Sequence, residues 1–503
     1  MCKALVNTCP LPGRVMVPGA GGLLLAITLS IHPAVNDSMS GNTRDDGTGT
    51  AVPRRLNLCY AMGEIPDMIA YQGFSFLIFT FYYVIMNVDV GLVTIVYIIW
   101  SVYNAFNDPV LGALSDKTKT RKLGGGRRRP WMVAMLVPLA AVMVFLFTPP
   151  AGDDVVVAAY MLAIMAIFDT IYTAYSLNHT SLYPEMFTTD RARESAGASR
   201  RIFMVFGLII AFALPSFFIS KYTGNPAETI PQYQMTGVVF GAVIAASILI
   251  HVKWGVKEPF YEGHASTGLN APGFIDSLKI TFKNKTFLIF VCASTTCWYC
   301  FTLLPMLMPL YGAKVLKQPD SFMTTLLLLV AFLATIPGVL MWSRIDARAG
   351  SKNGMMYSML WWAFSLLMLV FITDYPIAMV AMIFVGFGLA GPTYFIDRNI
   401  SNIADEDRIK TGCRREASYY GVHAVFIRLA AILVILSVNI VFTYSGWEDA
   451  SLIPIAPEQV FGIRLLMSVF PAVTLAIGMV LLKGVKLGKA DVKAIQEKLK
   501  NCT

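Results

Sequence analysis

Residues 104–131, NAFNDPVLGALSDKTKTRKLGGGRRRPW, decide how the rest of the chain is interpreted. A long apolar run precedes them, so Asn104 and Asp108 fall within a helix of membrane length. A carboxylate inside such a helix is costly and usually faces a cavity or a partner. Residues four apart share a helix face, and Pro109 removes the hydrogen bond that the carbonyl of Ala105 would accept. The cluster therefore suits an ion or proton site; the alternative is a kinked helix whose Asp108 pairs with a basic residue.

The composition is that of a membrane protein, because 56% of the 503 residues are hydrophobic and 14% are charged. The net charge of +9 does not indicate a nucleic-acid partner, since most Lys and Arg lie between apolar runs, where they orient the chain in the membrane. The 8 cysteines include a Cys-x-x-Cys pair at Cys297 and Cys300. Without a second pair or nearby histidines, helix packing explains it better than metal or redox chemistry. We expect no metal and no cofactor.

Apolar runs of about 20 residues recur along the chain and predict an all-α membrane protein with twelve transmembrane helices. The predicted spans are 66–86, 92–114, 131–147, 155–178, 202–220, 236–254, 287–311, 322–342, 355–373, 377–396, 420–443 and 460–482. An even number of spans places both ends of the chain on one side of the membrane.

Clusters of Lys and Arg identify that side as the cytoplasm. They follow every second span, whereas opposite loops such as 148–154 and 444–457 contain neither residue type. Both termini are therefore predicted to be cytoplasmic, in a multi-pass protein of the cytoplasmic (inner) membrane. The basic segments are 117–129, 191–200, 253–285, 344–352 and 408–415, with six further lysines after residue 482.

The longest basic connection divides the spans six and six. We expect a leader at 1–54, a six-helix bundle at 55–252, a cytoplasmic linker at 253–285, a second six-helix bundle at 286–484 and a cytoplasmic tail at 485–503. In the leader, the apolar run 15–31 fits a signal peptide. An upstream extension that ends before a natural start at Met39 fits better, because residues 39–56 resemble a short cytoplasmic leader.

The two halves share a charge pattern in the loops after the fourth and tenth spans. Each contains Asp-x-x-Arg followed by a second Arg at the same distance. Repeated halves around a central cavity are typical of transporters. The alternative is that any two cytoplasmic loops collect charge. The matched residues are Asp190, Arg193 and Arg200 in one half and Asp405, Arg408 and Arg415 in the other.

Four segments spread over both halves resemble the glycoside–pentoside–hexuronide:cation symporter family of the major facilitator superfamily. They are LCYAMGEIPD (58–67), YNAFNDPVLGALSDKTKTRKLGGGRRRPW (103–131), LYPEMFTTDRARESAGASRR (182–201) and NIADEDRIKTGCRREASYYG (402–421). The resemblance implies the major facilitator fold. It also implies secondary active transport of a sugar or glycoside by cation symport and alternating access, and no enzymatic activity.

The resemblance further implies which residues form the site. The family's cation site has two acids four apart in the second helix, and Asn104 and Asp108 occupy these positions here. One acid instead of two favours H⁺ over Na⁺ as the coupling ion. Two arginines at the substrate site would also suit an acidic substrate such as a hexuronide, because Arg binds carboxylates bidentately. The substrate positions match Asp67 (with Glu64 as the alternative), Ser176 (or Asp169 if the helix is shifted), Arg201 and Arg428.

Charged residues of the basic loops are expected to form a cytoplasmic gate. The alternative functions are a sodium-coupled symporter and a lipid or amphiphile carrier of the same fold. A membrane enzyme is disfavoured, because the sequence shows no catalytic motif and no P-loop. We expect a monomer whose partners are a small-molecule substrate and the lipid bilayer. The gate residues are Asp116, Arg121, Arg127, Arg193 and Arg408.

Overall fold

A computed structural model describes residues 53–118, 126–187, 190–258, 282–411, 416–447, 456–485 and 488–502. The described residues are helical, apart from turns and one isolated β-bridge between Lys221 and Asp320. The first group of helices is α4 (Arg54–Ala61), α5 (Glu64–Phe79), η3 (Thr80–Ile85), α6 (Val90–Lys117), α7 (Arg129–Phe145), α8 (Asp154–Met186), α9 (Asp190–Ala213), α10 (Pro215–Phe218), α11 (Pro226–Ile250) and η5 (His251–Gly255). The second group is α13 (Lys285–Leu310), η6 (Tyr311–Val315), α14 (Ser321–Ala349), α15 (Ser351–Met368), α16 (Tyr375–Thr411), α17 (Glu416–Tyr444), α18 (Pro457–Met467), α19 (Val469–Lys483) and α20 (Lys489–Cys502).

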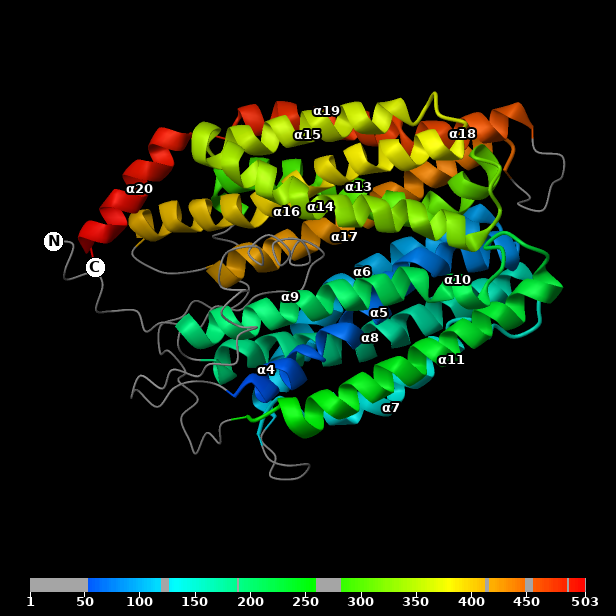
Figure 1. The fold of residues 1–503 in the computed structure, drawn as a ribbon, viewed down its shortest axis with the longest axis horizontal. Helices are drawn as coiled ribbons and strands as arrows, with labels where there is room; N and C mark the ends of the chain where they lie inside the picture. The colour runs from blue at the N-terminus through cyan, green and yellow to red at the C-terminus, as the bar shows by residue number, and fades with distance from the viewer. Residues whose placement is uncertain are drawn as a thin grey trace.

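The helices form two bundles that lie side by side. Figure 1 shows α4–α11 in the lower bundle, α13–α19 in the upper bundle, and α20 extending from one end. Helices α5, α6 and α9 of the lower bundle pack against α13, α17 and α14 of the upper bundle, respectively. The domain boundaries at the linker stay a prediction, since residues 259–281 lie outside the described part of the chain.

The same local conformation recurs at the start of both bundles. Helix α5 continues into the π-turn η3, and α13 continues into the π-turn η6. Asn87 and Lys317 follow with a φ of 53° each. Asp89 and Asp320 then begin α6 and α14, and each carboxylate accepts a backbone N–H of the first turn. Such a cap is worth about 1 kcal/mol. This repeat supports an internally duplicated chain, which the sequence predicted from other residues.

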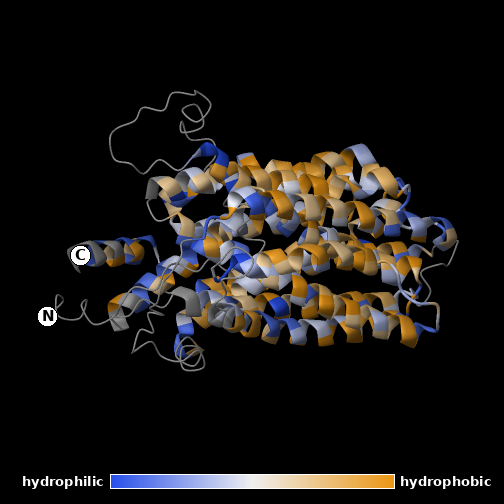
Figure 2. Ribbon diagram, turned by 90° about the horizontal axis from the view of Figure 1, so that it is seen from below, coloured by the Kyte–Doolittle hydropathy of each residue, from blue (hydrophilic) through white to orange (hydrophobic). Residues whose placement is uncertain are grey.

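The helices have the length and composition of membrane spans. Ten helices of the described residues are long and apolar enough to cross a membrane. Figure 2 shows apolar residues along the middle of the bundles and hydrophilic residues toward their ends. The predicted spans 131–147 and 355–373 are also helical, as α7 and α15, but α7 has only 17 residues and neither belongs to the ten. An all-helical, multi-pass membrane fold is confirmed, whereas the number of twelve spans stays a prediction.

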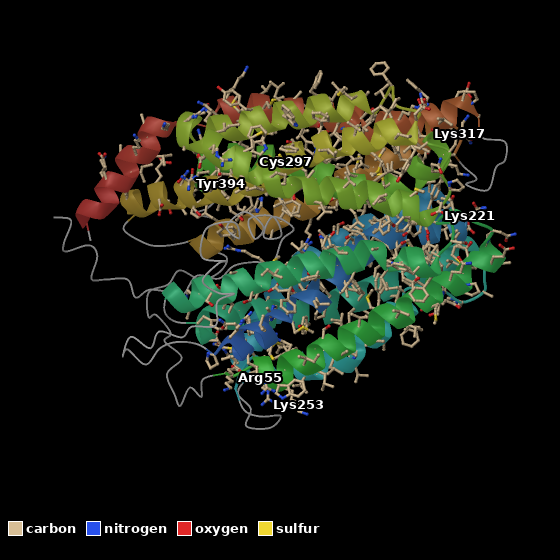
Figure 3. The ribbon with its side chains drawn as sticks, viewed as in Figure 1. Arg55, Lys221, Lys253, Cys297, Lys317 and Tyr394 are labelled. Atoms are coloured by element: carbon tan, nitrogen blue, oxygen red, sulfur yellow. The ribbon has the colours of Figure 1, made fainter. Side chains whose placement is uncertain are left out.

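The two bundles are joined at the end where α10 and α14 meet. Figure 3 shows Lys221 and Lys317 at this end, and Arg55 and Lys253 at the opposite end of the lower bundle. We call the hydrogen bonds that join the two bundles at this end the α10–α14 seal. The hydroxyl of Tyr83 donates to the carbonyl of Trp447 (2.6 Å), the amide of Ser321 donates to the carbonyl of Ser220 (3.1 Å), the hydroxyl of Thr325 donates to the carbonyl of Phe212 (3.3 Å), and the hydroxyls of Tyr222 and Thr325 lie 2.9 Å apart.

Candidate functional site

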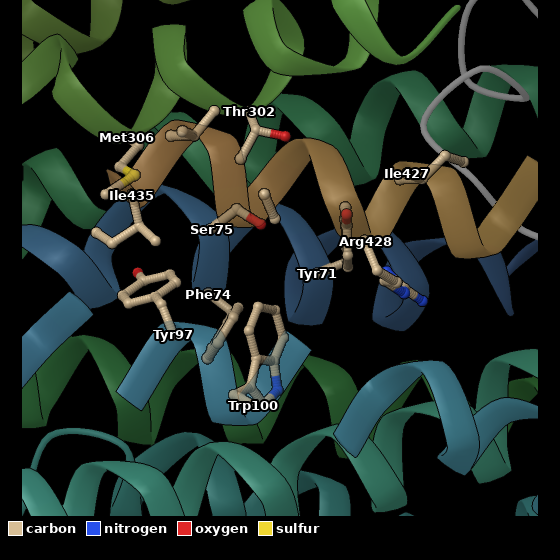
Figure 4. Close-up of a pocket in the computed structure, with 12 residues that line it drawn as sticks. Tyr71, Phe74, Ser75, Tyr97, Trp100, Thr302, Met306, Ile427, Arg428 and Ile435 are labelled. Carbon is tan, nitrogen blue, oxygen red and sulfur yellow. The ribbon is translucent and has the colours of Figure 1, made fainter. Parts of the chain in front are cut away.

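A pocket lies between the bundles, at the centre of the molecule. Helices α5 and α6 form one wall, and α13 and α17 form the other. In Figure 4, Arg428 and Tyr71 lie at one end of the pocket, and Tyr97, Ile435 and Met306 lie at the other. Most of the lining is aromatic or aliphatic, with hydroxyl groups and one guanidinium. The lining residues are Tyr71, Phe74, Ser75, Tyr97, Trp100, Thr302, Met306, Ile427, Arg428, Ala431, Val434 and Ile435.

An ion pair connects the two bundles at the Arg428 end of this pocket. Nη2 of Arg428 donates to Oδ2 of Asp108 at 3.0 Å, and the hydroxyl of Thr173 donates to Oδ1 of the same carboxylate at 3.0 Å. The side chains of Arg428 and Asp108 are 20% and 29% exposed, so neither is fully removed from water. The pairing that the sequence suggested as one alternative for Asp108 is present, and it adjoins a pocket.

Two polar groups of the pocket lining have no hydrogen-bond partner within the described residues. They are Nε of Arg428 and Nε1 of Trp100, and both belong to residues that line the pocket. An unpaired buried donor costs about 1–3 kcal/mol. A bound molecule with acceptor oxygens would satisfy both donors.

Asparagine and aspartate side chains surround the ion pair. Asn104 is buried, and its Oδ1 has no hydrogen-bond partner in the described part of the chain. Asn107 donates to Oδ2 of Asp169 at 2.9 Å, and both side chains are buried. Sequence reasoning missed Asn107, although its position next to Asp108 in an apolar helix was a usable signal. Asp169 of α8 therefore lies beside the candidate cation site, which consists of Asn104 and Asp108.

The remaining predicted substrate residues lie outside the pocket lining. Asp67 on α5 is buried next to Tyr172 and Ser176 of α8. Oδ1 of Asp67 and Oγ of Ser176 have no hydrogen-bond partner among the described residues. Arg201 is half-buried on α9 and is not among the described residues that line the pocket. Among the predicted substrate residues, Arg428 is the one that lines the pocket. The roles of Asp67, Ser176 and Arg201 stay predictions.

The predicted cytoplasmic gate is described only in part. Arg127 donates to Oε1 of Glu185 at 2.7 Å, and Nε of Arg193 donates to the carbonyl of Phe187 at 2.7 Å. Both contacts hold the chain near the ends of α7, α8 and α9, but they do not test whether these residues gate transport. Arg121 and the side chains of Asp116 and Arg408 lie outside the described residues.

Sequence reasoning also missed a buried group of ionisable side chains in the lower bundle. Glu64 interacts with Arg200 and His179, and His179 interacts with His251. Glu64 had been considered only as an alternative substrate residue. The usable signal was the presence of ionisable residues inside the predicted apolar spans or directly beside them.

Comparison with known proteins identifies the family. Residues 59–489 match the family described as MFS/sugar transport protein. The chain belongs to this family. It is thus a multi-pass membrane transporter of the major facilitator superfamily and not an enzyme, which confirms the resemblance found in the sequence.

Relatives within the superfamily differ in what their names say they carry. YagG of Escherichia coli, named a putative glycoside/cation symporter, is 23% identical over 90% of this chain and 95% of its own length. The sphingosine-1-phosphate transporter MFSD2B of Mus musculus is 22% identical over 84% of this chain and 87% of its own length. The crystal structure of the nucleoside transporter NupG has a TM-score of 0.63 at 15% identity, covering 86% of this chain and 99% of that chain. This last likeness shows the fold alone.

Proposed function

We propose that this transporter is a proton-coupled symporter for a small organic anion with a ring or other apolar body, such as an acidic glycoside of the hexuronide type. The observation that carries the proposal is the ion pair between Asp108 and Arg428 beside the central pocket. Aromatic rings of the pocket suit stacking on a sugar ring, and a guanidinium suits a carboxylate. The hexuronide group is among those that the family resemblance implies.

The ion pair gives a physical reason for coupling. While Asp108 is ionised, it competes with an anionic substrate for Arg428. When a proton binds Asp108, the carboxylate loses its charge, and Arg428 becomes available to the substrate. Substrate anion and proton therefore favour each other's binding, as symport requires. Na⁺ needs several oxygen ligands with enough negative charge to offset dehydration. Positions 104 and 108 supply one acid, and the neighbouring carboxylate of Asp169 already accepts from Asn107 at 2.9 Å, so the site suits H⁺ better.

A second candidate is a carrier of anionic amphiphiles. The specific observation is the aliphatic part of the pocket wall, which Met306, Ile427, Val434 and Ile435 form together with Ala431. These residues offer an apolar surface for an acyl chain, and Arg428 offers a cation for an anionic head group. MFSD2B, whose name describes transport of sphingosine-1-phosphate, lends support to this alternative.

The test is uptake into proteoliposomes that carry an imposed pH gradient, an imposed sodium gradient or neither. A panel of labelled hexuronides, neutral glycosides and lysophospholipids would be supplied under each condition. We expect accumulation of an anionic substrate driven by the pH gradient, and its loss in Asp108→Asn. Accumulation driven by sodium at symmetric pH would contradict proton coupling, and uptake restricted to lysophospholipids would favour the second candidate.

A further inference from the structure

A second cluster of ionisable groups lies outside the central pocket, where α4, α5, α8, α9 and η5 meet. Glu64, His179 and His251 are at most 1% exposed. Nε2 of His179 lies 3.0 Å from Oε1 of Glu64, and Nδ1 of His179 lies 3.2 Å from Nε2 of His251. Nδ1 of His251 lies 3.3 Å from the carbonyl oxygen of Cys59. Arg200 donates to the same oxygen of Glu64. We call Glu64, His179 and His251 the histidine chain.

Counting protons along the histidine chain shows that it is one proton short when its groups are in their usual states. The chain ends on two acceptors, the carbonyl of Cys59 and the carboxylate of Glu64. Three hydrogen bonds between these ends need three protons. Two neutral imidazoles carry only one N–H each. One contact would then bring two acceptors together, and a buried contact of this kind is unfavourable.

One additional proton satisfies every contact in the histidine chain. If an imidazole takes it, the rings donate to Cys59, to each other and to Glu64. If the carboxyl of Glu64 takes it, Glu64 donates to His179, His179 to His251 and His251 to Cys59, so that all three bonds point in one direction along the chain. Both arrangements contain the same number of protons, so the geometry fixes the proton count without fixing its position.

Charges around the histidine chain also favour one additional proton. Asp67 lies close enough to interact with both Glu64 and His179, and Arg200 is the cation that pairs with Glu64. Two carboxylates and one guanidinium leave one negative charge, and one proton neutralises it. Buried charges are tolerated when they are compensated in this way. The hydroxyls of the tyrosines that face the cluster donate to main-chain carbonyls: that of Tyr60 to His179 (2.6 Å), that of Tyr175 to Gly63 (3.1 Å) and that of Tyr183 to Arg193.

A metal ion is a poorer occupant than a proton. The imidazole nitrogens and the carboxylate oxygen point at one another, not at a common centre. Across the described residues, no group of three or more His, Cys, Asp or Glu side chains has the arrangement of a metal site.

We propose that Glu64, His179 and His251 form a proton-binding site that is separate from Asp108 and takes up one proton shared along the histidine chain. Side chains connect it to the central pocket: Tyr172 borders Asp67, and its ring lies 5.8 Å from the ring of Tyr71, which lines the pocket. Any role of the histidine chain in proton coupling rests on the proposed function, whereas its binding of a proton is independent of that proposal.

The test is ¹⁵N NMR of the full chain, labelled in histidine and reconstituted in lipid nanodiscs, between about pH 5 and about pH 9, around the ordinary imidazole range. The chain has 5 histidines, so the spectrum is simple. We expect two rings whose signals change together with the loss of one proton. His251→Gln places an amide that donates to His179, and Glu64→Gln places one that donates from the other end. Either variant satisfies the chain with neutral imidazoles. The joint titration therefore disappears in Glu64→Gln, and the remaining His179 ring does not titrate in His251→Gln.

His423→Gln is the matched control, because His423 is also buried but bonds to Ser294 at 3.1 Å in the upper bundle. This variant keeps the joint titration. The proposal is overturned if the two rings of the wild-type protein titrate independently or not at all, if the joint titration persists in Glu64→Gln, or if the remaining His179 ring still titrates in His251→Gln. A sodium-driven transporter would still show the joint titration, so failure of the proposed function is distinguishable from failure of this inference.

Discussion

The contact between Asp108 and Arg428 is a cross-bundle interaction whose strength is measurable. The perturbation is a double-mutant cycle with Asp108→Asn, Arg428→Gln and the combined variant. The two charged atoms lie 3.0 Å apart, on side chains that are 29% and 20% exposed. Breaking a fully buried pair costs about 3–5 kcal/mol, and an exposed pair contributes about 0.2–1 kcal/mol. At this intermediate exposure we expect a coupling energy of about 1–3 kcal/mol, because each single variant leaves one charge without its partner.

The assay is reversible unfolding of the purified transporter in mixed micelles, at fixed pH and ionic strength. The combined variant should regain part of the stability that each single variant loses. The control cycle uses Arg127 and Glu185, a pair with exposures of 41% and 23%, and should give less than about 1 kcal/mol. If the effects of the Asp108 and Arg428 substitutions are simply additive, the two groups do not interact in the resting state. The argument for substrate–proton coupling then loses its basis.

Three further predictions concern single positions. Asn104→Asp restores a second acid near Asp108, so sodium dependence of uptake should appear or increase; unchanged uptake across sodium concentrations would contradict this. Gly386→Ala should destabilise the transporter by about 1–3 kcal/mol in thermal unfolding, because a Cβ there would lie 2.1 Å from the carbonyl oxygen of Ala331. The control is Gly421→Ala in α17, whose Cβ meets nothing within 4 Å; this variant should lose no stability, since Ala is the better helix former. Asn107→Ala removes the donor to the buried carboxylate of Asp169 and should cost about 1–3 kcal/mol, whereas Asn107→Asp, which adds a second carboxylate, should cost more.

The arrangement along the chain was predictable, because apolar runs and basic loops depend on local composition. The span 131–147 shows the limit: its helix is apolar but has only 17 residues, so composition alone does not decide whether it crosses the membrane. The partner of Asp108 could be suspected from charge but not identified from spacing, since Arg428 is 320 positions away. Asn104 and Asp108 were found from their spacing in an apolar helix. The substrate residues came from resemblance, and the pocket lining includes Arg428 alone among them.

The histidine chain shows what a scan for familiar motifs overlooks. His179 and His251 are 72 positions apart and belong to separate apolar runs, so no motif joins them. The proton count depends on which ring nitrogen faces which acceptor, and only side-chain geometry supplies that. A systematic list of ionisable residues inside the apolar runs or within two residues of their ends would have named Glu64, His179 and His251, though not their connection.

The α10–α14 seal has a consequence for the analysis of related sequences. Most of its hydrogen bonds end on a main-chain carbonyl, at Trp447, Ser220, Phe212 and, from the hydroxyl of Ser321, Ile219. Correlated substitutions reveal contacts because both side chains must change together. Any residue type supplies a main-chain carbonyl, so the acceptor residue can be substituted by another type while the hydrogen bond is kept. Covariation methods should therefore underestimate how firmly the two bundles are joined here, and coevolution-based reconstructions of this region should show them further apart than they are.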